Sequence, residues 1–235
     1  MKAFLLAAGR ARRLYPLTKD IPKCLLRVGS RTLLERQVEL LKAVGIDDVT
    51  VVTGHRAERI HEVMGRTVKY IYNPYFAVTA DIVSLWCLRK LMRGAFLYLH
   101  SDVLFSRGIL ERLVGRVGGD VCLAVDPKPC DAEDEKVRVA GDFIVEIGKT
   151  VPLDKTYGEF IGMARVSDGA APRLREALEF LIDDGQLEVQ CTEAIQRLID
   201  HGDRVEMCPV NGFPWMEIDF YRDFEKAVRN AHLFG

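Results

Sequence analysis

The sequence lacks a strong excess of charge, a long apolar run and a targeting segment. Its 33 basic and 34 acidic residues give a formal net charge of -1, which provides no electrostatic basis for binding nucleic acid or an anionic membrane. No apolar run approaches the ~20 residues that span a bilayer. The apolar stretch within residues 1–8 is too short for a secretory signal, and its arginines follow it instead of preceding it. We therefore expect a soluble, cytoplasmic protein with no nucleic-acid or membrane partner.

Cysteine and histidine patterns of metal sites are also missing. None of the six cysteines forms a Cys-x-x-Cys pair, and no cysteine/histidine cluster has the spacing of a zinc site. Most of these cysteines lie in apolar runs, as in Val121-Cys122-Leu123. They are interpreted as reduced thiols of the core. The five histidines suggest no catalytic triad.

Short apolar runs alternate with amphipathic stretches through the first half of the chain. Apolar residues make up 49% of the sequence, enough for a large core. This alternation predicts an α/β fold with a doubly wound, mostly parallel, Rossmann-like sheet. The expected strands cover residues 3–7, 49–53, 69–72, 96–99 and 121–125, and the expected helices cover residues 32–44, 57–64, 82–92 and 107–117.

The pattern changes after the fifth strand. We expect one domain over residues 1–235, carrying a small inserted β-hairpin and helical lobe at roughly residues 126–215. Its elements are predicted as a hairpin of residues 136–139 and 143–147, a strand at 159–166 and helices at 173–182 and 192–200. Strands at 205–210 and 215–219 and a final helix complete the chain.

The loop after the first strand has the residues of a phosphate-binding site. Small residues at 7, 8 and 9 let a ligand approach the backbone at the carboxyl end of the strand, where open α/β sheets bind ligands. Backbone N–H groups there can hold phosphate oxygens. Arg13 and Lys23 add positive charge, since arginine grips a phosphate with two hydrogen bonds and lysine acts as a mobile point charge. Arg10 and Arg12 are interpreted as solvated.

Two aspartates follow predicted strands. Asp102 comes after the strand at 96–99, and Asp219 follows residues 215–218. Both can emerge at the edge that carries the first loop. Mg²⁺ bound to nucleotide phosphates is usually held by one or two carboxylates. The alternatives are an aspartate in a turn and, for Asp219, an N-cap of the final helix.

Residues 6–18, followed by Pro22-Lys23, resemble the signature of a nucleotidyltransferase family. That family includes the sugar-1-phosphate nucleotidylyltransferases and the bacterial phosphocholine cytidylyltransferases, and its signature is small-small-Gly-x-Gly-x-Arg-Leu-x-Pro-Leu-Thr. Ala11 stands where the second glycine is usual. Ala80-Asp81 replaces an Asn-Asn or Asp-Asn pair of the cytidylyltransferase branch. Residues 73–76, 79–85, 134–137, 147–149, 159–164 and 215–219 also fit that branch.

The resemblance implies transfer of a nucleotidyl group, with CTP favoured, from a nucleoside triphosphate to a small phosphorylated acceptor. Pyrophosphate is released, and Mg²⁺ is the expected cofactor. It implies catalytic roles for Lys23, Arg13 and Asp102 and metal binding by Asp102 and Asp219. The predicted nucleotide-binding residues are Leu6, Ala7, Ala8, Gly9, Arg13, Lys23, Thr79, Asp81 and Ser84.

The acceptor is expected beside the inserted lobe, at Lys149, Glu159, Trp215 and Glu217. Carboxylates beside an aromatic ring suit an ammonium group, by charge and by cation–π attraction. Glu159 could equally bind sugar hydroxyls, Trp215 could belong to the core, and Glu217 could be solvated. The segment at 188–193 lacks the aromatic residues expected for phosphocholine, so phosphocholine-like, phosphonate and polyol or sugar phosphate acceptors all stay open.

Other functions stay open as alternatives. One is a sugar-1-phosphate uridylyl-, thymidylyl- or guanylyltransferase, and another is a regulatory paralogue that binds nucleotide sugars without catalysis. A dinucleotide-binding oxidoreductase is disfavoured because the first loop lacks Gly-x-Gly-x-x-Gly spacing. The oligomeric state is also open, with a homodimer as one alternative.

Overall fold

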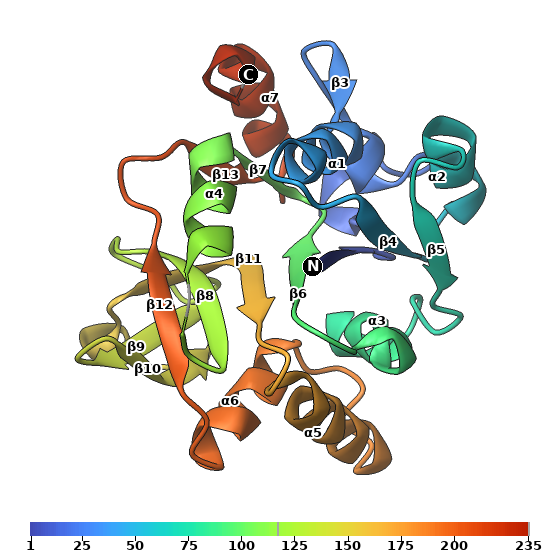
Figure 1. Ribbon diagram of the computed structural model, residues 1–235. Coiled ribbons are helices and arrows are strands. Elements are labelled where there is room, and N and C mark those ends of the chain that lie inside the picture. Colours follow the sequence, from blue (N-terminus) through green and yellow to red (C-terminus); the bar gives the residue numbers. More distant parts are fainter. Residues whose placement is uncertain (117, 235) are drawn as a thin grey trace.

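The first strand sets the layers of the fold. In the computed structural model, which describes residues 1–116 and 118–234, β1 (Lys2–Ala7) is almost entirely buried. Phe4 and Leu6 pack into the core on one face of the sheet, whereas Leu5 and Ala7 pack into the core on the other. This follows from the alternation of side chains along a strand. Helices therefore cover both faces of the sheet (Figure 1).

The described elements follow the chain in this order. The strands are β1, β2 (Arg27–Val28), β3 (Arg31–Thr32), β4 (Asp48–Thr53), β5 (Lys69–Tyr72), β6 (Phe96–His100), β7 (Val103–Phe105), β8 (Val121–Asp126), β9 (Lys136–Ala140), β10 (Phe143–Gly148), β11 (Gly158–Val166), β12 (Val205–Pro209) and β13 (Trp215–Glu217). The α-helices are α1 (Leu33–Ala43), α2 (Ala57–Met64), α3 (Asp81–Cys87), α4 (Arg107–Gly115), α5 (Ala171–Asp183), α6 (Thr192–Asp200) and α7 (Tyr221–Arg229).

The main sheet is mixed and has nine strands, in the order β5-β4-β1-β6-β11-β8-β12-β10-β9. The α/β class is thereby confirmed. Strands β5, β4, β1 and β6 are parallel, whereas β11 runs antiparallel to both β6 and β8. The reversal occurs because β8 reaches β11 through the β9–β10 hairpin instead of through a helical crossover, which parallel neighbours require.

The predicted lobe at residues 126–215 does not stand apart from the sheet. Strand β11 lies in the middle of the sheet between β6 and β8, and β12 pairs in parallel with β8. The sequence could not show this, because the partner of a strand is decided by packing and not by the strand's own residues. The hairpin β9–β10 forms the edge of this half of the sheet, and helices α5 and α6 pack against one of its faces (Figure 1).

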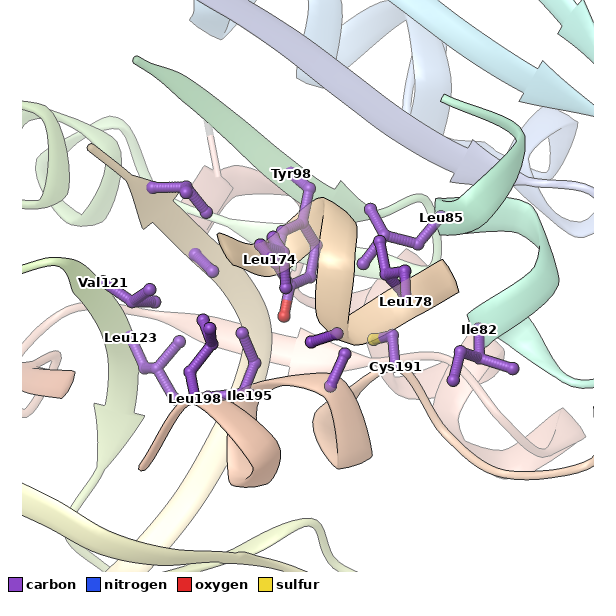
Figure 2. Packing of buried hydrophobic residues seen from close by; sticks show 14 of the residues in the cluster. Ile82, Leu85, Tyr98, Val121, Leu123, Leu174, Leu178, Cys191, Ile195 and Leu198 are labelled. Atoms are coloured by element: carbon purple, nitrogen blue, oxygen red, sulfur yellow. The ribbon is translucent and has the colours of Figure 1, made fainter. Parts of the chain in front are cut away.

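Two groups of helices bury the two faces. Helices α1, α2 and α4 contribute Leu34, Ile60 and Leu110 to one core. Helices α3, α5 and α6 contribute to the other, where Ile82, Leu85, Leu174, Leu178, Ile195 and Leu198 surround Tyr98 and Cys191 (Figure 2). Within the described part of the chain, no helix has both the length and the apolar character needed to cross a membrane.

Where several helices begin and end can be compared with the sequence. Helix α1 begins after a capping box, in which Thr32 accepts from the Glu35 backbone and the Glu35 side chain accepts from the Thr32 backbone. The helix expected at 82–92 ends at Cys87 and continues as a 3₁₀ turn at Arg89–Leu91. The helix expected at 107–117 ends at Gly115, and Val117 lies outside the described residues.

The departure from the family signature at Ala11 has a backbone consequence. Ala11 has φ 48° and ψ 50°, in the left-handed region. That conformation costs an L-residue roughly 1–2 kcal/mol, whereas glycine adopts it freely.

We predict that Ala11→Gly raises the free energy of unfolding by up to about 1 kcal/mol, because the relieved strain exceeds glycine's entropy cost of ~0.5–1 kcal/mol. Urea unfolding measures the difference. The matched control is Ala43→Gly in α1, where glycine should lower the free energy of unfolding by about 0.5–1 kcal/mol. A loss of stability in both variants would contradict the assignment of strain to Ala11.

Candidate active site

The loop after β1 leaves open space for a ligand. A Cβ at Gly9 would meet no protein atom within 4 Å, so no protein atom crowds the backbone here. The start of the loop is fixed, since the carbonyl of Ala8 accepts a 2.9 Å hydrogen bond from the backbone of His55. Gly54 lies against the same carbonyl, and a Cβ there would be 2.7 Å from it. The loop is therefore held by its neighbours but open toward the cavity.

A second, two-stranded sheet brings the two aspartates together. Strand β13 pairs antiparallel with β7, with Glu217 opposite Val103. The Ile218 backbone also donates a hydrogen bond to the carbonyl of Asp102, at 3.2 Å. Asp102 precedes β7 and Asp219 follows β13, so this pairing joins residues 117 positions apart in sequence.

Lys23 lies between these aspartates. Its Nζ is 2.9 Å from Oδ2 of Asp102 and 2.6 Å from Oδ1 of Asp219. Burial alone would lower the pKa of Lys23, but the ion pairs with Asp102 and Asp219 raise it above its usual value. Arg13 donates to the other oxygen of Asp219 at 3.2 Å. The predicted catalytic residues Lys23, Arg13 and Asp102 thus meet at one point with Asp219.

Glu217 joins this cluster. Burial, Asp102 and Asp219 raise its pKa to about 8. Carboxylate oxygens of Asp102, Glu217 and Asp219 lie within 4.8 Å of one another. Among the residues that the structure describes, Oδ1 of Asp102 is buried with no hydrogen-bond partner. Clustered carboxylates with an unused oxygen fit Mg²⁺, which prefers hard oxygen ligands. Glu217, predicted to contact the acceptor, is therefore also placed to bind metal.

A cavity of about 940 Å³ opens beside the cluster. Most residues predicted from the sequence line it: Leu6, Ala8, Gly9, Arg13, Thr79, Asp81, Ser84, Asp102, Lys149, Glu159, Trp215, Glu217 and Asp219. The remaining two, Ala7 and Lys23, line an adjoining pocket that shares Leu6, Gly9 and Asp102 with the cavity. The tertiary structure thus places the three predicted groups of residues around one space.

Next to the residues predicted to bind the acceptor, the cavity contains a cation that the sequence did not single out. Nζ of Lys128 is 2.8 Å from Oε2 of Glu159 and 5.9 Å from the centre of the Trp215 ring. Burial raises the pKa of Glu159 to about 7 although Lys128 opposes the shift. Trp215 is held by a 2.9 Å hydrogen bond from its indole nitrogen to Asp126. Lys149 lies farther out, 3.5 Å from Glu133.

The residues predicted to bind nucleotide lie at the start of α3 and in the loop before it. The Thr79 hydroxyl donates to the carbonyl of Tyr75 at 3.0 Å, and Ser84 accepts from the buried Asn73 amide at 3.0 Å. Asp81 accepts from the Cys191 backbone at 2.8 Å. These bonds fix the wall of the cavity.

Two cavity residues that were not predicted, Asp126 and Lys128, could have been found from their place at the end of a strand. Asp126 ends β8 and Lys128 follows it, and β8 runs parallel to β1 and β6 because β11 is antiparallel to both β6 and β8. The rule that ligands bind beyond the carboxyl ends of strands therefore applies to β8, as it does to β1 and β6. Asp134 and Glu135, which also line the cavity, follow in the connection to the hairpin; residues 134–137 fit the cytidylyltransferase branch in sequence, but no role was predicted for them.

Comparisons with known proteins agree with this geometry. The model of the MobA-like NTP transferase domain matches residues 3–189. The CTP:phosphoglutamine cytidylyltransferase of Campylobacter jejuni is 24% identical, over 97% of this chain and 99% of its own length. The bifunctional IPC transferase and DIPP synthase of Rubrobacter xylanophilus is 31% identical over 94% of this chain, and the match spans 50% of that longer protein.

A solved structure extends the likeness to the fold. The CTP:phosphocholine cytidylyltransferase from Streptococcus pneumoniae superimposes with a TM-score of 0.79 at 22% identity, over 97% of both chains. The match of the family model covers most of this chain and includes the loop after β1, Lys23 and Asp102. The chain belongs to the family of MobA-like NTP transferase domains, and is a nucleotidyltransferase.

Proposed function

We propose that this protein transfers a cytidylyl group from CTP to a small phosphorylated acceptor and releases pyrophosphate. The observation that carries the proposal is the meeting of Lys23, Asp102 and Asp219 beside a cavity lined by the residues predicted to bind nucleotide and acceptor. Two of the relatives named above, the cytidylyltransferases of Campylobacter jejuni and Streptococcus pneumoniae, act with CTP by their names, which favours cytidylyl transfer over transfer of another nucleotide.

The chemistry needs positioning more than acid–base catalysis. An acceptor phosphate oxygen attacks the α-phosphorus, and the bond from that phosphorus to the bridging oxygen breaks as pyrophosphate leaves. A phosphomonoester has its second pKa near ~6, so the attacking oxygen is already anionic at neutral pH and needs no general base. Two anions must still approach each other, and fixed positive charge lowers that barrier.

Lys23 and Arg13 supply this charge. Lys23 is held by two carboxylates, from which its ammonium can pass to the α-phosphate when substrate binds. Arg13 is more exposed, pairs with Asp219, and can bind the leaving β- and γ-phosphates with two hydrogen bonds. Asp102, Asp219 and Glu217 would hold Mg²⁺, which supplies charge stabilisation at the transferring phosphoryl group.

The acceptor wall favours a substrate with an ammonium group. Glu159 and the face of Trp215 already accommodate one ammonium, that of Lys128. An acceptor's ammonium group can replace it there by the same charge and cation–π attraction. Lys128 and Lys149 are then placed to bind an acceptor carboxylate or phosphate.

We predict that Lys23→Ala and Asp102→Ala each lower the rate of pyrophosphate release by at least roughly 10²–10³, because each removes an electrostatic contact to the reacting phosphate or its metal. Lys19→Ala, an exposed substitution in the same loop, serves as control and should keep its rate. Circular dichroism checks that the variants fold. Near-normal turnover in either of the first two variants would refute the assignment.

The donor and acceptor are tested by a matrix of four nucleoside triphosphates against phosphocholine, aminoethylphosphonate, sugar-1-phosphates and alditol phosphates, with and without Mg²⁺. We expect pyrophosphate release with CTP, with Mg²⁺ and with an ammonium-bearing acceptor. Release with UTP, dTTP or GTP and a sugar-1-phosphate would favour the sugar nucleotidyltransferase alternative. No release in any combination would favour a regulatory, non-catalytic protein.

The raised pKa of Glu159 predicts a pH dependence. Its carboxyl is largely protonated below a pH of about 7 and charged above it. The KM for an ammonium-bearing acceptor should therefore fall as pH rises through that value, because only the charged form attracts the ammonium. Glu159→Gln should remove this fall, whereas Glu111→Gln, exposed on α4, should keep it. Equal pH profiles for wild type and Glu159→Gln would exclude this role.

A further inference from the structure

Three side chains from separate elements meet in the wall of the cavity, away from the Lys23 cluster. Asp81 begins α3, His100 ends β6, and Cys191 directly precedes α6. Nε2 of His100 is 3.4 Å from Oδ2 of Asp81 and 3.5 Å from Sγ of Cys191. The oxygen, nitrogen and sulfur atoms all lie within 4.8 Å of one another. The histidine nitrogen therefore faces two other potential ligand atoms at once.

These separations are those of a tetrahedral zinc site. Zinc bonds of ~2.1 Å to nitrogen or oxygen and ~2.3 Å to sulfur, at tetrahedral angles, separate a nitrogen from an oxygen by about 3.4 Å and a nitrogen from a sulfur by about 3.6 Å. The two measured separations agree with these values. One thiolate, one imidazole and one carboxylate form a donor set that suits Zn²⁺ and not Mg²⁺, which prefers oxygen ligands alone.

Surrounding groups orient the Asp81 and His100 side chains of the cluster. Oδ1 of Asp81 accepts the backbone N–H of Cys191, which leaves Oδ2 turned toward His100. The His100 ring fits against Gly162, where a Cβ would be 2.8 Å from the ring. Metal-bound carboxylates and imidazoles in proteins are commonly oriented by such outer contacts.

A buried hydroxyl lies in the same core region as the cluster. Tyr98 is fully buried, and among the described residues its hydroxyl has no hydrogen-bond partner. Figure 2 shows Tyr98 and Cys191 in the same buried cluster. A metal-bound thiolate is a much better acceptor than a thiol, so binding of a metal would satisfy this hydroxyl.

The cavity side of the cluster has room for a fourth ligand. Asp81 and His100 line the cavity together with Glu135, whereas Cys191 is fully buried. Oε2 of Glu135 accepts from Thr192 at 2.9 Å, and Oε1 is buried without a hydrogen-bond partner among residues 1–116 and 118–234.

We propose that Asp81, His100 and Cys191 bind one Zn²⁺ ion, with a fourth position on the cavity side. The Cys191 proton passes to solvent when its thiolate binds the ion. The ion ties the start of α3, the end of β6 and the start of α6 together, so it fixes the nucleotide wall of the cavity. This site is distinct from the Mg²⁺ site at Asp102, Glu217 and Asp219 and does not depend on the transfer reaction.

The test uses the full chain, stripped with a chelator and then dialysed against Zn²⁺ in excess Mg²⁺. We expect one zinc ion retained per chain by elemental analysis. With Co²⁺ in place of zinc, we expect tetrahedral visible bands and a near-ultraviolet thiolate-to-cobalt charge-transfer band. Cys191→Ser should lose that band and weaken zinc binding by more than the roughly 10–100-fold that loss of an outer contact costs.

Matched variants separate this site from others. Cys208→Ser removes another fully buried cysteine, and Asp102→Asn alters the carboxylate cluster; both should keep the charge-transfer band. His100→Gln provides a second ligand variant and should also lose tight zinc binding, with folding checked by circular dichroism. Failure of the wild type to retain zinc against a micromolar chelator would overturn the proposal, as would retention by folded Cys191→Ser or His100→Gln. None of these measurements requires transfer activity, so failure of the proposed function is read separately.

Discussion

The ion pairs of Lys23 with Asp102 and Asp219 are the interaction on which the arrangement of this site depends. Two carboxylates and a third, Glu217, gather within 4.8 Å, and like charges this close repel strongly in a partly buried setting. The ammonium of Lys23 offsets part of that repulsion, and the protonation of Glu217 implied by its raised pKa offsets more. The carboxylates that need a cation in the free protein are those that can hold Mg²⁺ and, through the ion, a bound triphosphate.

Backbone hydrogen bonds hold these charged side chains close together. Strand β13 is bound to β7 by a ladder of three residue pairs, and Ile218 is bonded to Asp102. Asp102 and Asp219 cannot separate unless these bonds break. Asp219 is in turn bonded through its backbone to Asp223 in the first turn of α7, so the C-terminal helix is part of the support of the site.

The cavity has walls of different chemistry. The nucleotide wall is fixed by hydrogen bonds of Ser84 and Asp81, whereas the acceptor wall combines Glu159, Trp215 and the cation of Lys128. By our proposal, the first wall binds the component common to every reaction of this type, and the second binds the component that distinguishes one reaction from another. The two walls come from different elements, since Asp81 and Ser84 lie on α3 whereas Glu159 lies on β11.

Sequence patterns alone predicted the α/β class, most element positions and the loop after β1, and they singled out Lys23, Asp102 and Asp219 as candidate site residues. These features depend on local periodicity and on short motifs, which the order of residues contains directly. The sequence did not determine the antiparallel course of β11, the place of Lys128 beside Glu159, or the approach of Glu217 to the aspartates. Nor does any sequence spacing indicate that Asp81, His100 and Cys191 meet, since they come from three elements as many as 110 positions apart. Only the packing of those elements brings their side chains together, because strand partners and helix positions are decided by the burial of the whole core.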